Sequence, residues 1–180
     1  MAAPFEPESE DIMTTTLFAQ PYDISATGFY FSDAEGYDEK AKALRNDYGD
    51  PVEEFEIQFI DGEQIDCELA QAIGINQANF RNYLTCVDDW QDWEKQRVIV
   101  AVGECGYDFQ PDTDPSNYKV DLYEADSLRA LAEQFVDEGL YGDIPESLQN
   151  YIDHEAIARD LAVEFSEITI AGERFAYASH

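Results

Sequence analysis

Basic residues are scarce in this sequence, and their scarcity excludes several kinds of protein. The 180 residues include 10 Lys and Arg against 40 Asp and Glu, which gives a formal net charge of −30. A surface with this charge repels nucleic acid and anionic membranes, so we expect neither as a partner. The expected partners are basic surfaces.

Residues that commonly perform chemistry or bind metals are equally few. The chain has two histidines, and His154 is not followed by a second histidine at the spacing of a zinc-binding helix. Glycine-rich phosphate loops are also missing. Three cysteines lack metal-ligand spacing, and we interpret them as reduced thiols: Cys67, Cys86 and Cys105. We therefore predict a protein that is not an enzyme and that binds no cofactor or metal.

Long apolar runs are missing as well. The longest, Val98 to Val102, is far shorter than the roughly 20 residues of a membrane-spanning helix. The first residues carry four carboxylates and no basic residue, which is untypical of a secretory signal peptide. We interpret residues 1–14 as a flexible acidic extension and expect a cytoplasmic protein.

The sequence nevertheless contains the material of a folded core. Hydrophobic residues make up 44% of the chain and aromatic residues 13%, which is too much for a disordered acidic tail. The acidic excess is also spread evenly. Residues 15–65 carry 12 acidic and 3 basic residues, residues 66–112 carry 9 and 3, and residues 113–180 carry 15 and 4. The sequence therefore predicts a folded protein with an acidic surface.

Hydrophobic periodicity predicts an α+β fold, arranged as an elongated chain of three small segments. The first, residues 15–65, is predicted to be an antiparallel sheet with one helix. Its predicted strands are 14–20, 29–31 and 53–61, and its predicted helix is 34–48. In the last strand Phe55 and Ile57 face one side while Glu54 and Glu56 face the other.

The second segment, residues 66–112, is predicted to be helical, and the third, residues 113–180, to be a sheet with helices. Helices are expected at 68–73 and 76–90, whereas the β-branched residues of 93–105 favour a strand by propensity. A Pro- and Asp-rich linker follows at 106–117. In the third segment we predict a strand at 118–122, a helix capped by Asp126 and ending at Gly139, and a hairpin of 163–170 with 174–177 that contains a bulge near Ser166–Glu167.

The segment from Asp143 to Leu161 is the most informative in the chain. Asp143 and Pro145 are typical of a helix start, and the apolar residues after them recur at helical spacing, which predicts one helix with a buried stripe. The segment resembles the C-terminal motif of the ArdA family of antirestriction proteins. The matching residues are Pro145, Ser147, Leu148, Gln149, Asn150, Tyr151, Ile152, Asp153, Ala156, Arg159, Asp160 and Leu161.

This resemblance implies a function and partners. ArdA proteins are carried by plasmids and conjugative transposons and inhibit type I restriction–modification enzymes, protecting incoming mobile DNA. The resemblance implies a B-DNA mimic that contacts the methyltransferase core, made of specificity and modification subunits, and it implies a helix over 93–105, which we predict. It also implies that the motif forms a homodimer contact, through Leu148, Asn150, Tyr151, Ile152, Asp153, Glu155, Ile157, Arg159, Asp160 and Leu161. For Arg159 the alternative is a local pair with Glu155.

Carboxylates at regular spacing can approximate a phosphate backbone. DNA carries one charge about every 3.4 Å per strand, while carboxylates four apart on a helix lie about 6 Å apart and those two apart on a strand nearly 7 Å (about two residue rises). The predicted DNA-mimicking surface comprises Asp33, Glu35, Asp38, Glu39, Glu53, Glu54, Glu56, Asp61, Asp88, Asp89, Asp92, Glu94, Asp112, Asp114, Asp121, Glu124, Asp137 and Glu138.

Two other interpretations of the acidic surface stay open at the level of sequence. An acidic binding module for a basic nucleoid-type protein would have the same charge. An acid-rich, lysine-poor composition is also typical of proteins adapted to a high-salt cytoplasm, whatever their function. Tighter binding to the methyltransferase than to a nucleoid protein would favour DNA mimicry over an acidic binding module. A need for molar salt to fold would favour salt adaptation.

Overall fold

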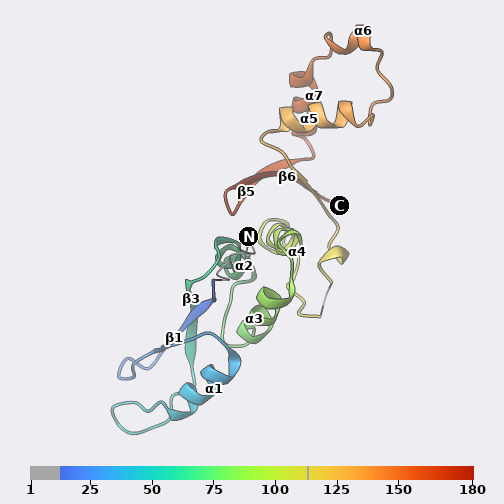
Figure 1. Ribbon diagram of the computed structural model, residues 1–180. Coiled ribbons are helices and arrows are strands. Elements are labelled where there is room, and N and C mark those ends of the chain that lie inside the picture. Colours follow the sequence, from blue (N-terminus) through green and yellow to red (C-terminus); the bar gives the residue numbers. More distant parts are fainter. Residues whose placement is uncertain (1–12, 113) are drawn as a thin grey trace, which may run out of the picture. The chain divides into compact units, whose positions relative to one another are not determined.

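The chain folds into two compact units with one small antiparallel sheet each (Figure 1). The structure, a computed structural model, describes residues 13–112 and 114–180. Unit 1 comprises the residues up to Glu63 together with Asn76–Arg81, and unit 2 comprises Gln64–Ile75 and Asn82–His180. With 41% helix and 21% strand, the predicted α+β class is confirmed. The division into three segments stays a prediction, and residues 1–12 of the expected acidic extension lie outside the described residues.

Unit 1 contains the strands that the alternation of apolar residues predicted. Its sheet has the order β2-β1-β3, with β1 at Thr16–Pro21, β2 at Phe29–Phe31 and β3 at Phe55–Asp61. Both neighbouring pairs are antiparallel. The buried face carries Leu17, Ala19, Phe31, Phe55 and Ile57.

Helix α1, Ala34–Ala43, is shorter than predicted. The Oδ1 atom of Asn46 accepts hydrogen bonds from the amides of Tyr48 and Asp50, at 2.9 Å each. Because this side chain offers the backbone a turn in place of helical bonds, the chain leaves the helix early. The predicted extension to Tyr48 is therefore wrong, and Tyr48 is exposed.

Unit 2 begins with helices. α2 spans Gln64–Ile73, and α3 spans Phe80–Asp89, of which Phe80 and Arg81 belong to unit 1. α4 spans Asp92–Val98 and continues as the π-helix η1, Ile99–Glu104. The helix predicted over 93–105 is thus confirmed against the local strand propensity, because its apolar side chains are buried on packing with α2. No helix in the described part of the chain is long and apolar enough to cross a membrane.

A buried ion pair lies among these helices. The Nζ atom of Lys95 is 2.7 Å from Oδ1 of Asp66, and the two side chains are 8% and 4% exposed. The hydroxyl of Tyr83 donates to the backbone carbonyl of Asp66 at 2.7 Å. Buried charges in proteins are tolerated when they are paired and hydrogen-bonded, and this pair meets that condition.

The sheet of unit 2 has the order β4-β6-β5, with β4 at Val120–Glu124, β5 at Ser166–Ile170 and β6 at Glu173–Ser179. The short 3-10 helix η2, Pro115–Asn117, precedes β4, and helix α5, Leu128–Asp137, follows it. The core below α5 contains Leu131, Phe135 and Ala176, with Tyr123 and Phe165 packed against it.

Two predicted details of this region are wrong. Ser127, not Asp126, caps α5, because the Ser127 hydroxyl accepts the Ala130 amide at 3.1 Å. The β5–β6 ladder has no bulge, since its register runs without interruption from Ser166 to Ile170. The change of phase that suggested a bulge arises because Val163 lies before the strand, in the turn after the preceding helix.

The segment from Asp143 to Leu161 forms two helices rather than the predicted one. α6 spans Glu146–Gln149 and α7 spans His154–Leu161. The Asp153 carboxylate accepts the Ala156 amide at 3.0 Å, so it caps a new helix. Pro145 occupies the cap position of α6 that was predicted for Asp143.

Candidate functional site

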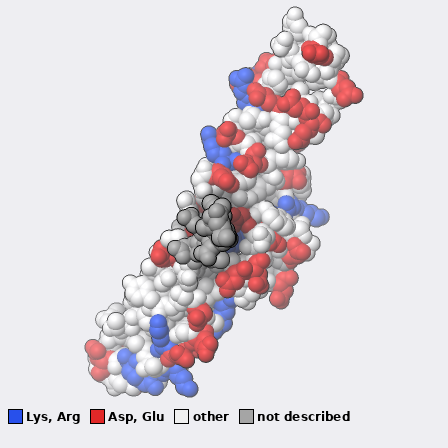
Figure 2. Space-filling model, in the orientation of Figure 1, with Lys and Arg blue, Asp and Glu red and all other residues white. Residues whose placement is uncertain are grey.

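The acidic surface is the most extensive polar feature of the chain. Of the 36 acidic side chains among the described residues, 31 are exposed, against 8 of the 10 basic ones. Figure 2 shows these carboxylates over elements of both units, with basic side chains in fewer places. Such a surface attracts cationic partners. Because one exposed ion pair contributes only about 0–1 kcal/mol, strong attraction requires many such pairs together.

In unit 1 the predicted carboxylates lie on α1 and along β3. Asp33 caps α1 by accepting the Gly36 amide at 2.6 Å. Asp38 forms a 2.6 Å ion pair with Arg81, and the hydrogen bond from this guanidinium lowers the pKa of Asp38. The remaining predicted carboxylates of unit 1 are exposed: Glu35, Glu39, Glu53, Glu54, Glu56 and Asp61.

The four predicted carboxylates near the α3–α4 junction are divided between two helix ends. Asp88 and Asp89 end α3, where the helix dipole disfavours anions. Asp92 and Glu94 lie instead in the first turn of α4, which favours them, and Glu94 accepts the Gln91 amide at 2.7 Å. The electrostatic cost of placing anions at the C-terminal end of a helix therefore applies to the first two carboxylates and not to Asp92 and Glu94.

The predicted carboxylates of the C-terminal part are distributed over loops, a strand and a helix. Asp114 caps η2, and hydrogen bonds from the Ser116 hydroxyl and amide lower its pKa. Asp121 contacts His180 and is half-buried. The other four are exposed: Asp112, Glu124, Asp137 and Glu138.

The structure also exposes carboxylates that the prediction left out. They lie on η1, α5, β5 and β6 and in loops of both units. They include Asp47, Asp50, Glu63, Glu104, Asp108, Asp126, Glu133, Glu164, Glu167 and Glu173. The only signal for them in the sequence is their charge, which does not distinguish a side chain that faces a partner from one that faces solvent. Asp66 is the opposite case, an acidic residue that burial removes from the surface.

The ArdA-like motif packs against α5, and the alternative interpretation of Arg159, a local pair with Glu155, is wrong. Glu155 pairs with Arg129 of α5, with 2.9 Å between Nη1 and Oε1, and not with Arg159. Arg129 is also 3.2 Å from Glu133. Arg159 is exposed and has no ion pair with any residue that the structure describes.

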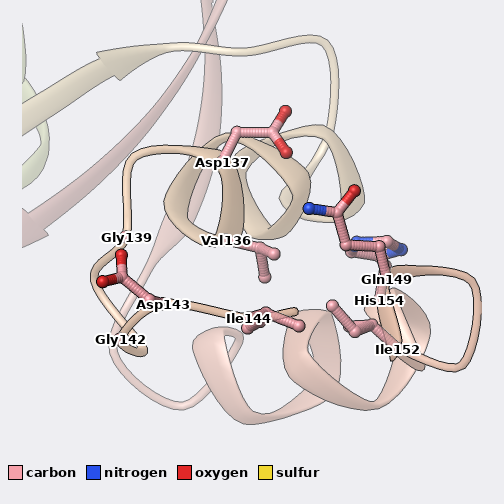
Figure 3. Close-up of a pocket in the computed structure, with 9 residues that line it drawn as sticks. All are labelled: Val136, Asp137, Gly139, Gly142, Asp143, Ile144, Gln149, Ile152 and His154. Atoms are coloured by element: carbon pink, nitrogen blue, oxygen red, sulfur yellow. The ribbon is translucent and has the colours of Figure 1, made fainter. Parts of the chain in front are cut away.

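A cavity of about 360 Å³ lies between the C-terminal end of α5 and the first part of the motif (Figure 3). Figure 3 shows Val136, Ile144 and Ile152 turned toward one another, with polar groups around them. The lining residues are Val136, Asp137, Gly139, Gly142, Asp143, Ile144, Gln149, Ile152 and His154. Ile152 of the motif is therefore directed into unit 2 rather than toward solvent.

Other apolar residues of the same region face solvent. Leu148 is 53% exposed and Tyr151 is 83% exposed. Ile157 and Leu161 are half-buried, and Leu161 packs against the α5 core. Further exposed apolar side chains nearby in the sequence are Leu140, Tyr141 and Val163. The polar motif residues Asn150, Asp153 and Asp160 are exposed as well.

The chemistry available to a catalyst is limited in the described residues. Among them there is no group of three or more His, Cys, Asp or Glu side chains that could hold a metal ion. Burial raises the pKa of the Cys86 thiol to about 11, which keeps it protonated and unreactive at neutral pH. The exposed carboxylates, by contrast, are suited to binding a cationic partner together rather than to catalysis.

Comparison with known families identifies the chain. A family model described as antirestriction protein (ArdA) matches residues 32–173. The chain belongs to the ArdA family. This match covers most of the chain, including α1, both sheets in part and the whole motif, so the resemblance seen in the motif extends well beyond it. A search of curated proteins gave no match. Membership of the ArdA family implies an antirestriction function and an interaction with restriction enzymes.

Proposed function

We propose that the protein inhibits type I restriction–modification enzymes by occupying their DNA-binding groove as a mimic of B-DNA. The observation that carries this proposal is the set of 31 exposed carboxylates in a chain of the ArdA family. A groove that grips phosphates with Lys and Arg is attracted to such a surface. Carboxylates held on helices and strands lose less conformational entropy on binding than those of a disordered chain.

The spacing of the carboxylates supports the proposal. On α1, Glu35, Asp38 and Glu39 are separated by three and four residues, which places neighbours about 6 Å apart. Glu54, just before β3, and Glu56, on β3, are both exposed and lie two residues apart, which is nearly 7 Å at about 3.4 Å per residue. Both intervals are close to the axial rise of two phosphates on one DNA strand, at about 3.4 Å each. A row of phosphate-binding cations can therefore meet a carboxylate at about every second position.

The partner in this proposal is the methyltransferase core of specificity and modification subunits. Contacts to phosphates hold such a core on a duplex whatever the base sequence, and these are the contacts that carboxylates can replace. By filling the groove, the protein would keep the enzyme from incoming mobile DNA without any chemical step. The mechanism needs no catalytic residue and no cofactor.

We also infer that the protein acts as a homodimer joined through the motif. Two protomers with a net charge of −30 each repel one another, so the contact between them must be apolar or charge-paired. Leu148 and Tyr151 supply exposed apolar surface, and Arg159 supplies an exposed cation. A two-fold axis would bring the same residues of both protomers together and continue the carboxylates across both.

A displacement experiment tests the proposed mechanism. The methyltransferase core is bound to a fluorescent duplex that contains its recognition site, and the purified protein is added. We expect complete displacement of the duplex, with inhibition that is overcome by excess DNA. Changing Glu54→Gln together with Glu56→Gln should weaken displacement by up to about thirtyfold, because each exposed charge contributes about 0–1 kcal/mol, or up to about fivefold.

The control is Gln58→Asn, which alters the same strand without changing its charge and should leave displacement as it is. A ternary complex, in which the core holds the duplex and the protein together, would refute occupancy of the groove. Tighter binding to a basic nucleoid-type protein than to the core would favour an acidic binding module instead.

A further inference from the structure

Helix α1 carries Glu35 and Glu39 of the proposed DNA-mimicking surface, although few of its own side chains are buried. Among its ten residues, all of which the structure describes, Tyr37 is the one buried side chain. The Lys40 ammonium adds a hydrogen bond, at 2.6 Å, to the Tyr30 carbonyl. A surface helix is normally oriented by a stripe of buried apolar residues, which α1 lacks. Other contacts must therefore determine where its carboxylates point.

Arg81, in the first turn of α3, makes such a contact beside Tyr37. Its Nη2 atom donates to Oδ1 of Asp38 at 2.6 Å, and its Nη1 atom donates to Oδ2 at 3.2 Å. The guanidinium carbon also lies 4.9 Å from the centre of the Phe80 ring and 5.5 Å from that of the Tyr37 ring. The pair therefore joins α1 to the start of α3 within unit 1 (Figure 1).

The geometry of this pair suits it to orienting a helix. The two side chains are 45% and 61% exposed, and exposed ion pairs usually contribute little to stability. Two parallel hydrogen bonds between a planar guanidinium and a carboxylate nevertheless define a direction, which a contact between point charges does not. The aromatic rings beside the guanidinium restrict it further. We therefore expect the pair to affect the orientation of α1 more than the stability of the fold.

The pair also changes what the carboxylates of α1 can do. Because Arg81 balances the charge of Asp38, a cation of the enzyme gains little from that carboxylate. Glu35 and Glu39 are exposed and have no ion pair with any residue that the structure describes. They lie four residues apart, on one side of the helix and about 6 Å from each other. These two carboxylates are the ones that α1 presents to a partner.

We propose that Arg81 is a positioning residue for inhibition: by binding Asp38, it fixes α1 so that Glu35 and Glu39 meet cations of the DNA-binding groove. This inference rests on the proposed function, because it takes the α1 carboxylates as substitutes for phosphates. In it Asp38 anchors the helix instead of replacing a phosphate. Charge alone predicts the reverse importance of Arg81, since removing a cation from the protein strengthens its attraction to a basic groove.

The test compares single and combined variants of the full chain in the duplex-displacement assay. Arg81→Gln makes the protein one charge more negative, yet we expect it to weaken displacement by about threefold to thirtyfold, as when two exposed charges are lost. Glu35→Gln combined with Glu39→Gln should cause a similar loss. The triple variant should displace the duplex as well as that double variant does, within about twofold, because the orientation of α1 no longer matters once both charges are gone.

The matched control is Lys42→Gln, which removes the same charge from α1 itself. Lys42 is exposed and has no ion pair within the described part of the chain, so its replacement should leave displacement unchanged or strengthen it by up to about fivefold. Arg81→Lys keeps the charge but not the two parallel bonds, and its loss should lie between those of the unchanged protein and Arg81→Gln. Unfolding midpoints above the assay temperature identify folded variants, and Arg81→Lys provides the same comparison if Arg81→Gln does not fold.

Two results would overturn the positioning role while leaving groove occupancy intact. One is displacement by Arg81→Gln that equals or exceeds that of the unchanged protein. The other is a triple variant several-fold weaker than the double variant, because Arg81 would then act independently of Glu35 and Glu39, as through the stability of the fold. Failure of the unchanged protein to displace the duplex at any concentration would overturn the proposed function, and this inference with it.

Discussion

Replacing Lys95 by methionine is expected to lower the free energy of unfolding by about 3–5 kcal/mol. Lys95 and Asp66 are 8% and 4% exposed, and the substitution removes the cation that balances the Asp66 carboxylate. The carboxylate then stays in a site with little water, where its charge is costly. Urea denaturation, followed by circular dichroism, measures the loss, because α2 and α4 contact one another and unfold with it.

Two controls define the cause of this loss. Lys95→Met combined with Asp66→Leu removes both charges and should recover most of the stability, because apolar residues of similar volume often replace a buried pair without loss. Arg129→Gln breaks exposed pairs with Glu133 and Glu155 and should cost at most about 1 kcal/mol. If Lys95→Met cost no more than Arg129→Gln, the buried pair would not be a determinant of stability.

The second large effect concerns assembly. Changing Leu148→Asp together with Tyr151→Asp should weaken dimerisation by about 100-fold or more, because both substitutions occur in each protomer and replace apolar anchors by like charges. The molecular mass at micromolar concentration, measured by analytical ultracentrifugation, should fall from that of two chains toward the 20.4 kDa of one. Displacement of DNA should weaken as well. A monomer presents half of the carboxylates, and it loses the additional affinity that two linked binding surfaces provide.

The control for this prediction is Trp93→Asp. Trp93 is 54% exposed in unit 2 and lies outside the motif, so its substitution adds one negative charge, where the double variant adds two, without touching the proposed contact. We expect the mass to stay that of a dimer. A double variant at positions 148 and 151 that remained dimeric would place the contact elsewhere, and an unchanged protein that was monomeric would refute the homodimer.

Several elements followed from the sequence because burial on one face leaves a clear pattern. The alternation in β3 is the best example, with Phe55 and Ile57 buried and Glu54 and Glu56 exposed. The extent of α1 did not follow, because its end depends on the Asn46 side chain competing for backbone amides. The break between α6 and α7 was missed for a related reason, since Asp153 suits a helix face in the sequence but serves as a cap.

The candidate site was predictable in kind but not in detail. Charge alone indicated an acidic surface, whereas the use of Asp33 and Glu94 as helix caps depends on where the helices begin. The partner of Glu155 is Arg129, 26 residues away in the chain, and periodicity within one helix cannot show it. The hydrogen bond from Asn46 to Asp23 joins two segments that are 23 residues apart in the chain, and no local pattern in the sequence indicates it.

The dependence of inhibition on salt tests most directly whether ordered carboxylates replace phosphates. The affinity of the protein for the methyltransferase core is measured over a tenfold range of salt concentration, beside that of a duplex. We predict that log affinity falls linearly with log salt for both, since cations of the same groove are engaged in each case. An affinity for the protein that stayed constant over this range would contradict the account.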